Sequence, residues 1–132
     1  MIGLLAGLST AALAEWTKID TAVAGSVERY LDKATIRKVG NITRVWVLDD
    51  YLNVKWPPSV GRREVPKSGK EQVEFNCDVE RARITSAVYY NAAMGAGQIM
   101  GSEDIPSRWT PVVPESLTET TMKLACALPS DR

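Results

Sequence analysis

Two neighbouring aspartates, Asp49 and Asp50, form the only adjacent acidic pair in the central region of the chain. Two carboxylates can perform acid–base chemistry when both face one substrate or share one proton. The apolar run before them, residues 45–48, predicts a strand, in which consecutive side chains point to opposite faces. We therefore interpret the pair as strand-end groups that contact solvent and turn amides. Asp32 is interpreted as a turn or cap ligand to backbone amides.

Other short patterns also fall short of a catalytic or phosphate-binding motif. Ser68 and Lys70 are two residues apart, whereas a lysine-activated serine needs S-x-x-K spacing. Gly95 and Gly97 lack the third glycine and the following helix of a phosphate loop. The acidic residues and cysteines form no metal-ligand pattern, and the chain contains no histidine, the commonest general base. The sequence predicts no enzyme activity, cofactor or metal site, and an enzyme of unknown type is only a third alternative.

The composition restricts the remaining classes of function. With 132 residues and 14.5 kDa, the chain fits one domain, and 45% hydrophobic with 24% charged residues is ordinary for a globular protein. Sixteen lysines and arginines balance sixteen aspartates and glutamates, so no net charge attracts nucleic acid or a membrane surface. No nucleic-acid partner is expected.

The first fourteen residues differ in character from the rest. Residues 2–14 carry no charge and are fewer than the roughly 20 that a membrane span needs. Ala12-Leu13-Ala14 before Glu15 is typical of a signal-peptidase site. We expect a signal peptide at 1–14 and a domain at 15–132, with a buried N-terminal helix as the alternative. No lysine or arginine precedes the apolar run, so the positively charged n-region of the signal peptide is truncated. Whether the true start codon lies upstream is left open. No cysteine lies at the cleavage point, so neither a lipid anchor nor a transmembrane segment is expected in the mature chain.

Export changes how the two cysteines are interpreted, because paired thiols form a disulfide in an oxidising compartment. Cys77 lies on the apolar face of a strand predicted at 71–79. A capping-box pattern at 116–119 predicts a helix on which Cys126 lies one turn after Met122. A bridge would connect this helix to the sheet and, by the chain-entropy model, stabilise the fold by about 4 kcal/mol. A redox-active pair is the alternative, but there is no C-x-x-C motif.

The rest of the chain reads as a series of strands. Alternating or apolar runs predict them at 16–20, 26–32, 42–52, 71–79, 81–91 and 98–102, and the run within 42–52 is apolar on both faces, as in a central strand. Strands in series followed by one helix predict an α+β domain, with an antiparallel sheet of about six strands and one C-terminal helix disulfide-linked to it.

An ordered set of motifs resembles a known family. The set comprises Trp16, Tyr30-Leu31-Asp32, Thr35-Ile36, Val45-Trp46-Val47-Leu48-Asp49-Asp50-Tyr51, Ser68 with Lys70, Asn76-Cys77, Ala87-Val88-Tyr89-Tyr90, Met94-Gly95-Ala96-Gly97, Trp109-Thr110-Pro111-Val112-Val113-Pro114-Glu115-Ser116 and Cys126. It resembles the surface-adhesin protein E family of exported proteobacterial proteins over nearly the whole mature chain. The resemblance implies a flat sheet of about six strands with a helix fixed to it. It also implies, from the namesake, self-association, a lipid anchor at the cell surface, and binding of host matrix and serum proteins. This chain lacks the anchoring cysteine.

Charge is unevenly distributed along the chain. Residues 29–70 carry ten basic and four acidic residues, whereas residues 71–132 carry five basic and nine acidic ones. The basic half includes a long connection at 53–70 that is rich in proline and glycine, and long connections are often functional. Tryptophan and arginine are enriched in binding hot spots. The predicted partner-binding residues are Trp56, Arg62, Arg63, Lys67 and Lys70. The alternative is a solvated hairpin loop whose Trp56 folds back on the sheet.

Two functions remain beside the unknown enzyme. The first is an exported, non-enzymatic binding domain that contacts extracellular or envelope proteins. The second is a structural or self-associating periplasmic envelope protein without adhesin activity, for which a homodimer is expected. The periplasm is the expected compartment, with the cell surface or the medium as alternatives.

Overall fold

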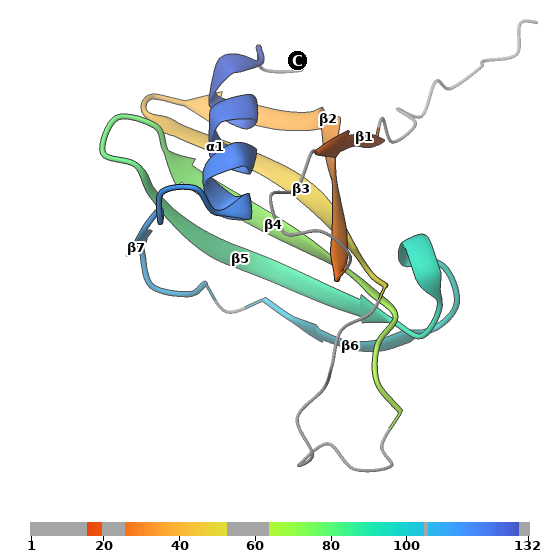
Figure 1. The fold of residues 1–132 in the computed structure, drawn as a ribbon. Coiled ribbons are helices and arrows are strands. Elements are labelled where there is room, and N and C mark those ends of the chain that lie inside the picture. Colours follow the sequence, from red (N-terminus) through yellow and green to blue (C-terminus); the bar gives the residue numbers. More distant parts are fainter. Residues whose placement is uncertain (1–15, 20–25, 53–63, 105, 130–132) are drawn as a thin grey trace, which may run out of the picture.

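The computed structural model describes residues 16–19, 26–52, 64–104 and 106–129, which form one sheet with one α-helix against it (Figure 1). The elements in chain order are strands β1 (Trp16–Ile19), β2 (Val27–Val39), β3 (Ile42–Tyr51), β4 (Ser68–Asn76) and β5 (Arg81–Tyr90), the short 3-10 helix η2 (Ala93–Gly95), strands β6 (Ile99–Glu103) and β7 (Thr110–Pro111), and helix α1 (Leu117–Ala127).

The sheet follows the order of the chain. Strands β1 to β6 pair in sequence and every pair is antiparallel, while the short β7 pairs with β5. The apolar run in β3 lies between β2 and β4, so its prediction as a central strand is confirmed. The predicted fold class, an antiparallel sheet of about six strands with a C-terminal helix, is confirmed as well.

An irregularity in β2 allows the strand to curve while keeping apolar residues on one face. In β2 the register shifts between Asp32 and Arg37, where the Asp32 carboxylate accepts the amide hydrogen of Ala34 at 3.0 Å. Leu31 and Ile36 are both fully buried, although they are five residues apart and would otherwise face opposite sides. The predicted strand at 26–32 was therefore too short, because a bulge interrupts the alternation without ending the strand. The prediction that Asp32 contacts a turn amide is confirmed.

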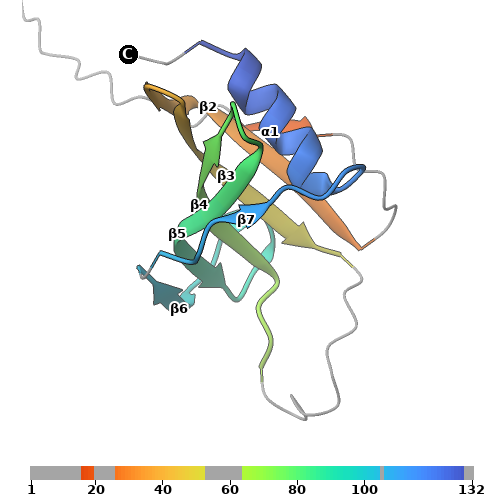
Figure 2. The same cartoon turned by 90° about the vertical axis from the view of Figure 1, so that its left-hand side faces the viewer.

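The core lies between the sheet and α1, which covers one face only (Figure 2). Its buried apolar residues are Ile19, Leu31, Ile36, Val45, Val47, Val73, Phe75, Ala82, Val112, Met122 and Ala125. The helix begins where the capping pattern predicts, since the Ser116 hydroxyl accepts the Glu119 amide hydrogen at 3.1 Å and the Glu119 carboxylate accepts that of Glu115 at 2.9 Å. None of the helices in the described ranges is long and apolar enough to cross a membrane.

A disulfide between Cys77 and Cys126 connects α1 to the sheet, as predicted. Its position in the sheet differs from the expectation, because β4 runs from Ser68 to Asn76 and Cys77 follows its last residue. Asn76 accepts amide hydrogens from Asp78 and Val79 and so starts a turn there. Val79 is therefore 59% exposed instead of facing the core.

Candidate binding surface on the open face of the sheet

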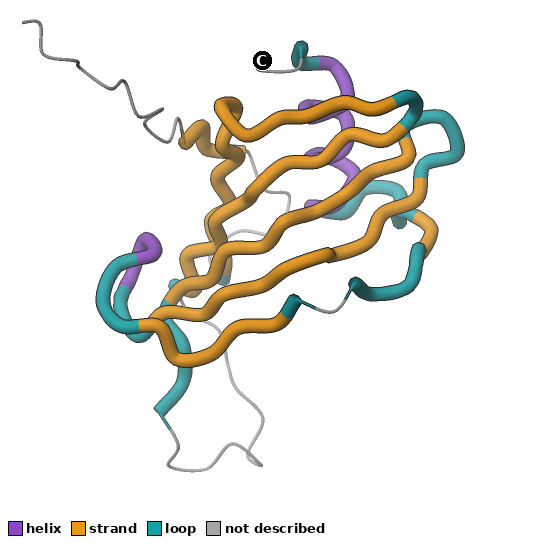
Figure 3. Tube along the Cα trace, turned by 180° about the vertical axis from the view of Figure 1, so that it is seen from behind, coloured by secondary structure: helices purple, strands orange, loops and turns teal. Residues whose placement is uncertain are grey.

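The sheet has two unlike faces, and the one opposite α1 is open over much of its area (Figure 3). Alternate residues of β3 and β4 point to this open face, including Asp50 and Ser68 at one end of the sheet. Segment η2 covers that end: the Met94 amide donates to the Asp50 carboxylate at 2.9 Å, and the Gly95 amide donates to the Ser68 hydroxyl at 2.8 Å. Beyond η2, described residues of the open face line an aromatic hollow and a hollow rich in arginine.

The aromatic hollow surrounds Lys70, which points to the open face from β4. The Lys70 ammonium lies 5.7 Å from the Trp16 ring centroid and 5.2 Å from that of Tyr90. Within the described part of the chain, it forms these two ring contacts and no ion pair. The hollow has a volume of about 280 Å³, and its other lining residues are Asp32, Thr35, Trp46 and Val88. Such a mixture of half-buried aromatic rings and one cation is typical of binding hot spots.

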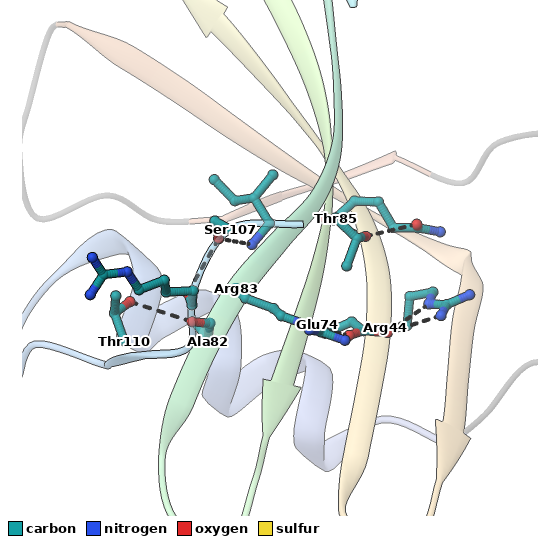
Figure 4. A network of polar contacts seen from close by, with 10 residues as sticks. Arg44, Glu74, Ala82, Arg83, Thr85, Ser107 and Thr110 are labelled. Atoms are coloured by element: carbon teal, nitrogen blue, oxygen red, sulfur yellow. Dashed lines mark hydrogen bonds and ion pairs between the residues drawn. The ribbon is translucent and has the colours of Figure 1, made fainter. Parts of the chain in front are cut away.

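The second hollow contains a carboxylate held between two guanidinium groups (Figure 4). Arg44 donates from Nε and Nη2 to Oε2 of Glu74 at 3.1 and 2.9 Å, and Arg83 donates from Nε to Oε1 at 2.8 Å. The Arg83 guanidinium lies 4.7 Å from the Trp109 ring centroid. Burial alone would raise the pKa of Glu74, but the hydrogen bonds from both arginines outweigh it and hold this pKa below its usual range. The carboxylate is thus ionised and fixes the positions of both arginines.

A different polar cluster lies on the face that carries α1. Arg29 donates from Nε and Nη2 to the two oxygens of Asp49 at 2.6 and 2.7 Å, and its Nη1 lies 3.4 Å from the Thr121 hydroxyl of α1. Glu71 lies 3.7 Å from Arg29, and burial raises the pKa of Glu71 in spite of this cation. Burial, together with the charges of Asp49 and Glu71, also raises the pKa of Tyr51. The tyrosine therefore stays protonated at neutral pH.

The residues considered first for chemistry are all engaged in structural contacts. Asp49 and Asp50 lie on opposite faces, as predicted, but both are buried, so the predicted contact with solvent is wrong. The predicted contact with a turn amide is confirmed for Asp50, which accepts the amide hydrogen of Met94 in η2. The Ser68 hydroxyl donates to the Ala92 carbonyl at 2.6 Å. Gly95 and Gly97 both have positive φ angles, as a turn requires. Among the described residues, no group of three or more acidic residues or cysteines is placed to hold a metal ion.

Of the five predicted partner-binding residues, the structure describes two. Lys70 lies in the aromatic hollow. Lys67 is exposed just before β4, and its backbone forms hydrogen bonds with the backbones of Tyr51 and Tyr90 on the two neighbouring strands. Because residues three apart on an extended chain point to opposite faces, the two lysines do not share one surface. Trp56, Arg62 and Arg63 lie outside the described residues.

Sequence analysis missed most of the open face. Trp46, Arg44 and Arg83 were placed in predicted strands, and none of them was predicted to bind a partner. The signal that could have found Arg44 and Trp46 is the alternation in β3, since both point away from the core on either side of the buried Val45. The other residues that line the two hollows come from several elements, including β1, β4, β5 and the segment before β7. Only the folded sheet brings them close to Arg44 and Trp46.

Comparison with known families decides the classification of this fold. The family described as surface-adhesin protein E matches residues 16–127, which include both hollows, the helix and both cysteines. The chain belongs to the surface-adhesin protein E family. The resemblance noted from the motifs is thereby confirmed. A search of curated proteins gives no significant match.

Solved structures of family members share the fold. In one, crystal form II of Haemophilus influenzae protein E, the match has a TM-score of 0.63 at 12% identity and covers 93% of this chain and 97% of the other. A second structure of Haemophilus influenzae protein E gives a TM-score of 0.59 at 14% identity, with 93% and 91% covered. Protein E from non-typeable Haemophilus influenzae gives 0.58 at 14% identity, with 91% and 82% covered. At these identities the likeness concerns the fold alone.

Proposed function

We propose that this protein is an exported, non-enzymatic domain that binds protein partners through the open face of its sheet. The observation that carries the proposal is the aromatic hollow: Trp16, Trp46 and Tyr90 surround Lys70 on a face that no other described element covers beyond η2. Half-buried aromatic side chains on a rigid sheet provide large apolar contact area at low entropic cost. Membership of an adhesin family supports the same function.

The proposal includes no catalytic step and no cofactor. The hydroxyl of Ser68 and the carboxylates of Asp49 and Asp50 all have intramolecular partners. Tyr51 and Tyr89 have raised pKa values, chiefly because they are buried, so neither is a ready nucleophile. The partners proposed instead are extracellular or envelope proteins, by analogy with the adhesin name of the family.

Export is part of the proposal, as expected for a surface-adhesin family. The leader is residues 1–14, with cleavage after Ala14, and the mature domain begins at Glu15. A disulfide between Cys77 and Cys126 suits an oxidising compartment. The periplasm is the proposed location, and the outer surface or the medium would serve the same binding function.

The test is binding of the purified domain to a panel of purified host matrix, serum and envelope proteins, compared with a Trp46→Ala variant. The wild-type domain should bind at least one protein saturably, and removal of a central aromatic anchor should weaken that binding about tenfold or more. Lys123→Ala is the matched control, because Lys123 is exposed on α1, on the other face. Saturable binding that Trp46→Ala leaves unchanged would contradict the proposed surface.

A second candidate function is self-association within the envelope. Strand β6 pairs with β5 on one side only among the described strands, and its Ile99 is 63% exposed. An edge strand of this kind can pair with a second copy of the chain. A stable dimer in light scattering, combined with no binding to any protein of the panel, would favour this function over the first.

A further inference from the structure

The arginine hollow has a composition that the aromatic hollow lacks. It is the larger of the two, with a volume of about 350 Å³. Arg37, Arg44 and Arg83 line it together with a single acid, Glu74. Even without Arg37, the guanidinium groups of Arg44 and Arg83 share the single carboxylate of Glu74, which leaves an excess of positive charge here, although the chain as a whole is neutral. Asn76 pairs with Arg81 in the sheet as Glu74 pairs with Arg83, so exposed Arg81 points to the same face.

Glu74 leaves much of the hydrogen-bonding capacity of these arginines unused. Its two oxygens accept from Nε and Nη2 of Arg44 and from Nε of Arg83. Within the described residues, Nη1 of Arg44 and both terminal nitrogens of Arg83 donate no hydrogen bond. The side chains of Arg44 and Arg83 are 49% and 31% exposed, so their free N–H groups can reach a ligand.

The two guanidinium groups are held in position before any ligand arrives. Glu74 is nearly buried and fixes one edge of each group, as Figure 4 shows, and the ring of Trp109 supports Arg83 at 4.7 Å. A fixed pair of arginines loses less side-chain entropy on binding than two mobile ones. The planar fork of an arginine matches a carboxylate through two parallel hydrogen bonds.

The walls of the hollow add apolar contacts. Val39 is 79% exposed, and Ile42 and Trp109 line the same hollow. Cations interspersed with apolar side chains suit a ligand in which carboxylates alternate with apolar groups. A peptide segment with Glu or Asp next to an apolar residue has this character, whereas a sulfated polysaccharide offers charge without the apolar groups.

We propose that the hollow between Arg44, Arg83 and Trp109 binds an acidic, partly apolar segment of a protein partner, with a carboxylate on the free N–H groups of the two arginines. This inference rests on the proposed function, since it assigns the chemistry of the partner. It also adds a second contact on the open face, separate from the aromatic hollow around Lys70.

The experiment uses a fluorescent peptide of alternating glutamate and leucine, titrated with the purified domain. Removing one charged donor while keeping an amide, in Arg83→Gln or Arg44→Gln, should weaken binding about tenfold. Each variant leaves Glu74 paired with the other arginine. Arg83→Lys keeps the charge but loses the fork, so it should recover only part of the affinity. Lys123→Gln, the same charge change on the opposite face, should bind as the wild type does.

The outcomes separate this inference from the proposed function. Equal losses of peptide affinity in Arg83→Gln and Lys123→Gln would show that binding depends on net charge alone and would overturn the inference. Equal affinity for a lysine–leucine peptide would overturn it as well. Tighter binding of a sulfated oligosaccharide that depends on the same arginines would replace the acidic segment by a polysaccharide. If a protein partner binds through Trp46 but is unaffected by Arg83→Gln, the inference fails and the proposed function stands. If the peptide result holds while no protein of the panel binds, the proposed function fails.

Discussion

Asp49 and Asp50 are consecutive in β3, yet their carboxylates serve opposite faces of the sheet. Asp49 accepts two hydrogen bonds from Arg29 on the face that carries α1, and Asp50 accepts the Met94 amide of η2 on the other face. Both are nearly buried, so each would be costly to leave without its partner. The arrangement fixes β2 to β3 on one side and η2 to the sheet on the other, and it leaves the rest of the open face available for a partner.

Gly69 in β4 is required because two tyrosine side chains lie where a larger side chain would be placed. A Cβ added at Gly69 would lie 2.7 Å from the Tyr51 hydroxyl and 3.2 Å from Cδ1 of Tyr89. Gly69→Ala should therefore lower the free energy of unfolding by about 1–3 kcal/mol, as overpacking does. Gly101→Ala is the control, since its Cβ would meet nothing within 4 Å. Adding Tyr51→Phe, which removes the hydroxyl, should recover part of the loss. Urea unfolding measures all three, and equal effects of the two glycine substitutions would contradict the prediction.

The disulfide should contribute substantially to stability. Cys77→Ala or Cys126→Ala opens a loop with a sequence separation of 49 and should cost about 2–5 kcal/mol, the usual range for small exported domains. Thermal and urea unfolding of the oxidised wild type and both variants give the comparison. Two free thiols in the unfolded, unreduced exported protein would show that the bridge is not formed in the cell.

Two glutamates three residues apart in β4, Glu71 and Glu74, should respond oppositely to pH. The folded-state pKa of Glu74 lies below its ordinary value of 4.5, because the arginine hydrogen bonds outweigh burial. Its ionised form therefore stabilises the fold above pH 4.5, and this stability is lost as the pH falls through the lowered pKa. Glu74→Gln should thus be less stable than the wild type at neutral pH, by about 1–3 kcal/mol, with the difference shrinking in acid.

Ionisation of Glu71 changes the folding stability in the opposite direction. Burial raises its pKa above 4.5, so ionisation costs stability at neutral pH, and this cost fades as the pH falls through the raised pKa towards 4.5. Glu71→Gln should be more stable than the wild type at neutral pH and equal to it in acid. Urea unfolding between about pH 3 and pH 7 measures both variants. The same direction of change for Glu71→Gln and Glu74→Gln would contradict these assignments.

The order of the strands could be predicted from the sequence because each strand has its own local pattern. The patterns of β1 to β6 and the capping residues of α1 are read within a few residues, and strands in series leave the meander as the simplest topology. The break at Asp32–Arg37 escaped prediction because a bulge changes the face of every later residue without changing composition. The burial of Glu74 escaped it because Arg44 and Arg83 come from the two neighbouring strands.

The binding surface was only partly predictable for the same reason. Lys70 was selected from the basic stretch, yet its neighbours Trp16 and Tyr90 come from β1 and β5, 54 and 20 residues away in the sequence. Charge counting along the chain finds a stretch such as 53–70, but a surface assembled across strands has no contiguous pattern.

The basic stretch itself stays a prediction. Reversing Arg62 and Arg63 to Glu should weaken binding of an acidic partner, and the effect should fade as the salt concentration rises past the physiological range. We expect the melting temperature to change little, as is usual when charges in contact with solvent are reversed. The affinity for an acidic partner at two salt concentrations and a thermal melting curve test this prediction. A double variant that unfolds would show that these residues are structural, and one that binds normally would leave the contact to the open face.

The central claim, that partners bind the open face, is tested most directly by nuclear magnetic resonance of the labelled domain titrated with a protein it binds. The account predicts that the indole signals of Trp16 and Trp46 and the amide signals around Lys70 and Tyr90 shift or broaden. The amide signals of Thr120 and Lys123 on the opposite side of the molecule should stay unchanged. Changes confined to α1 or to β6, with the Trp16 and Trp46 indole signals unaffected at saturation, would contradict it.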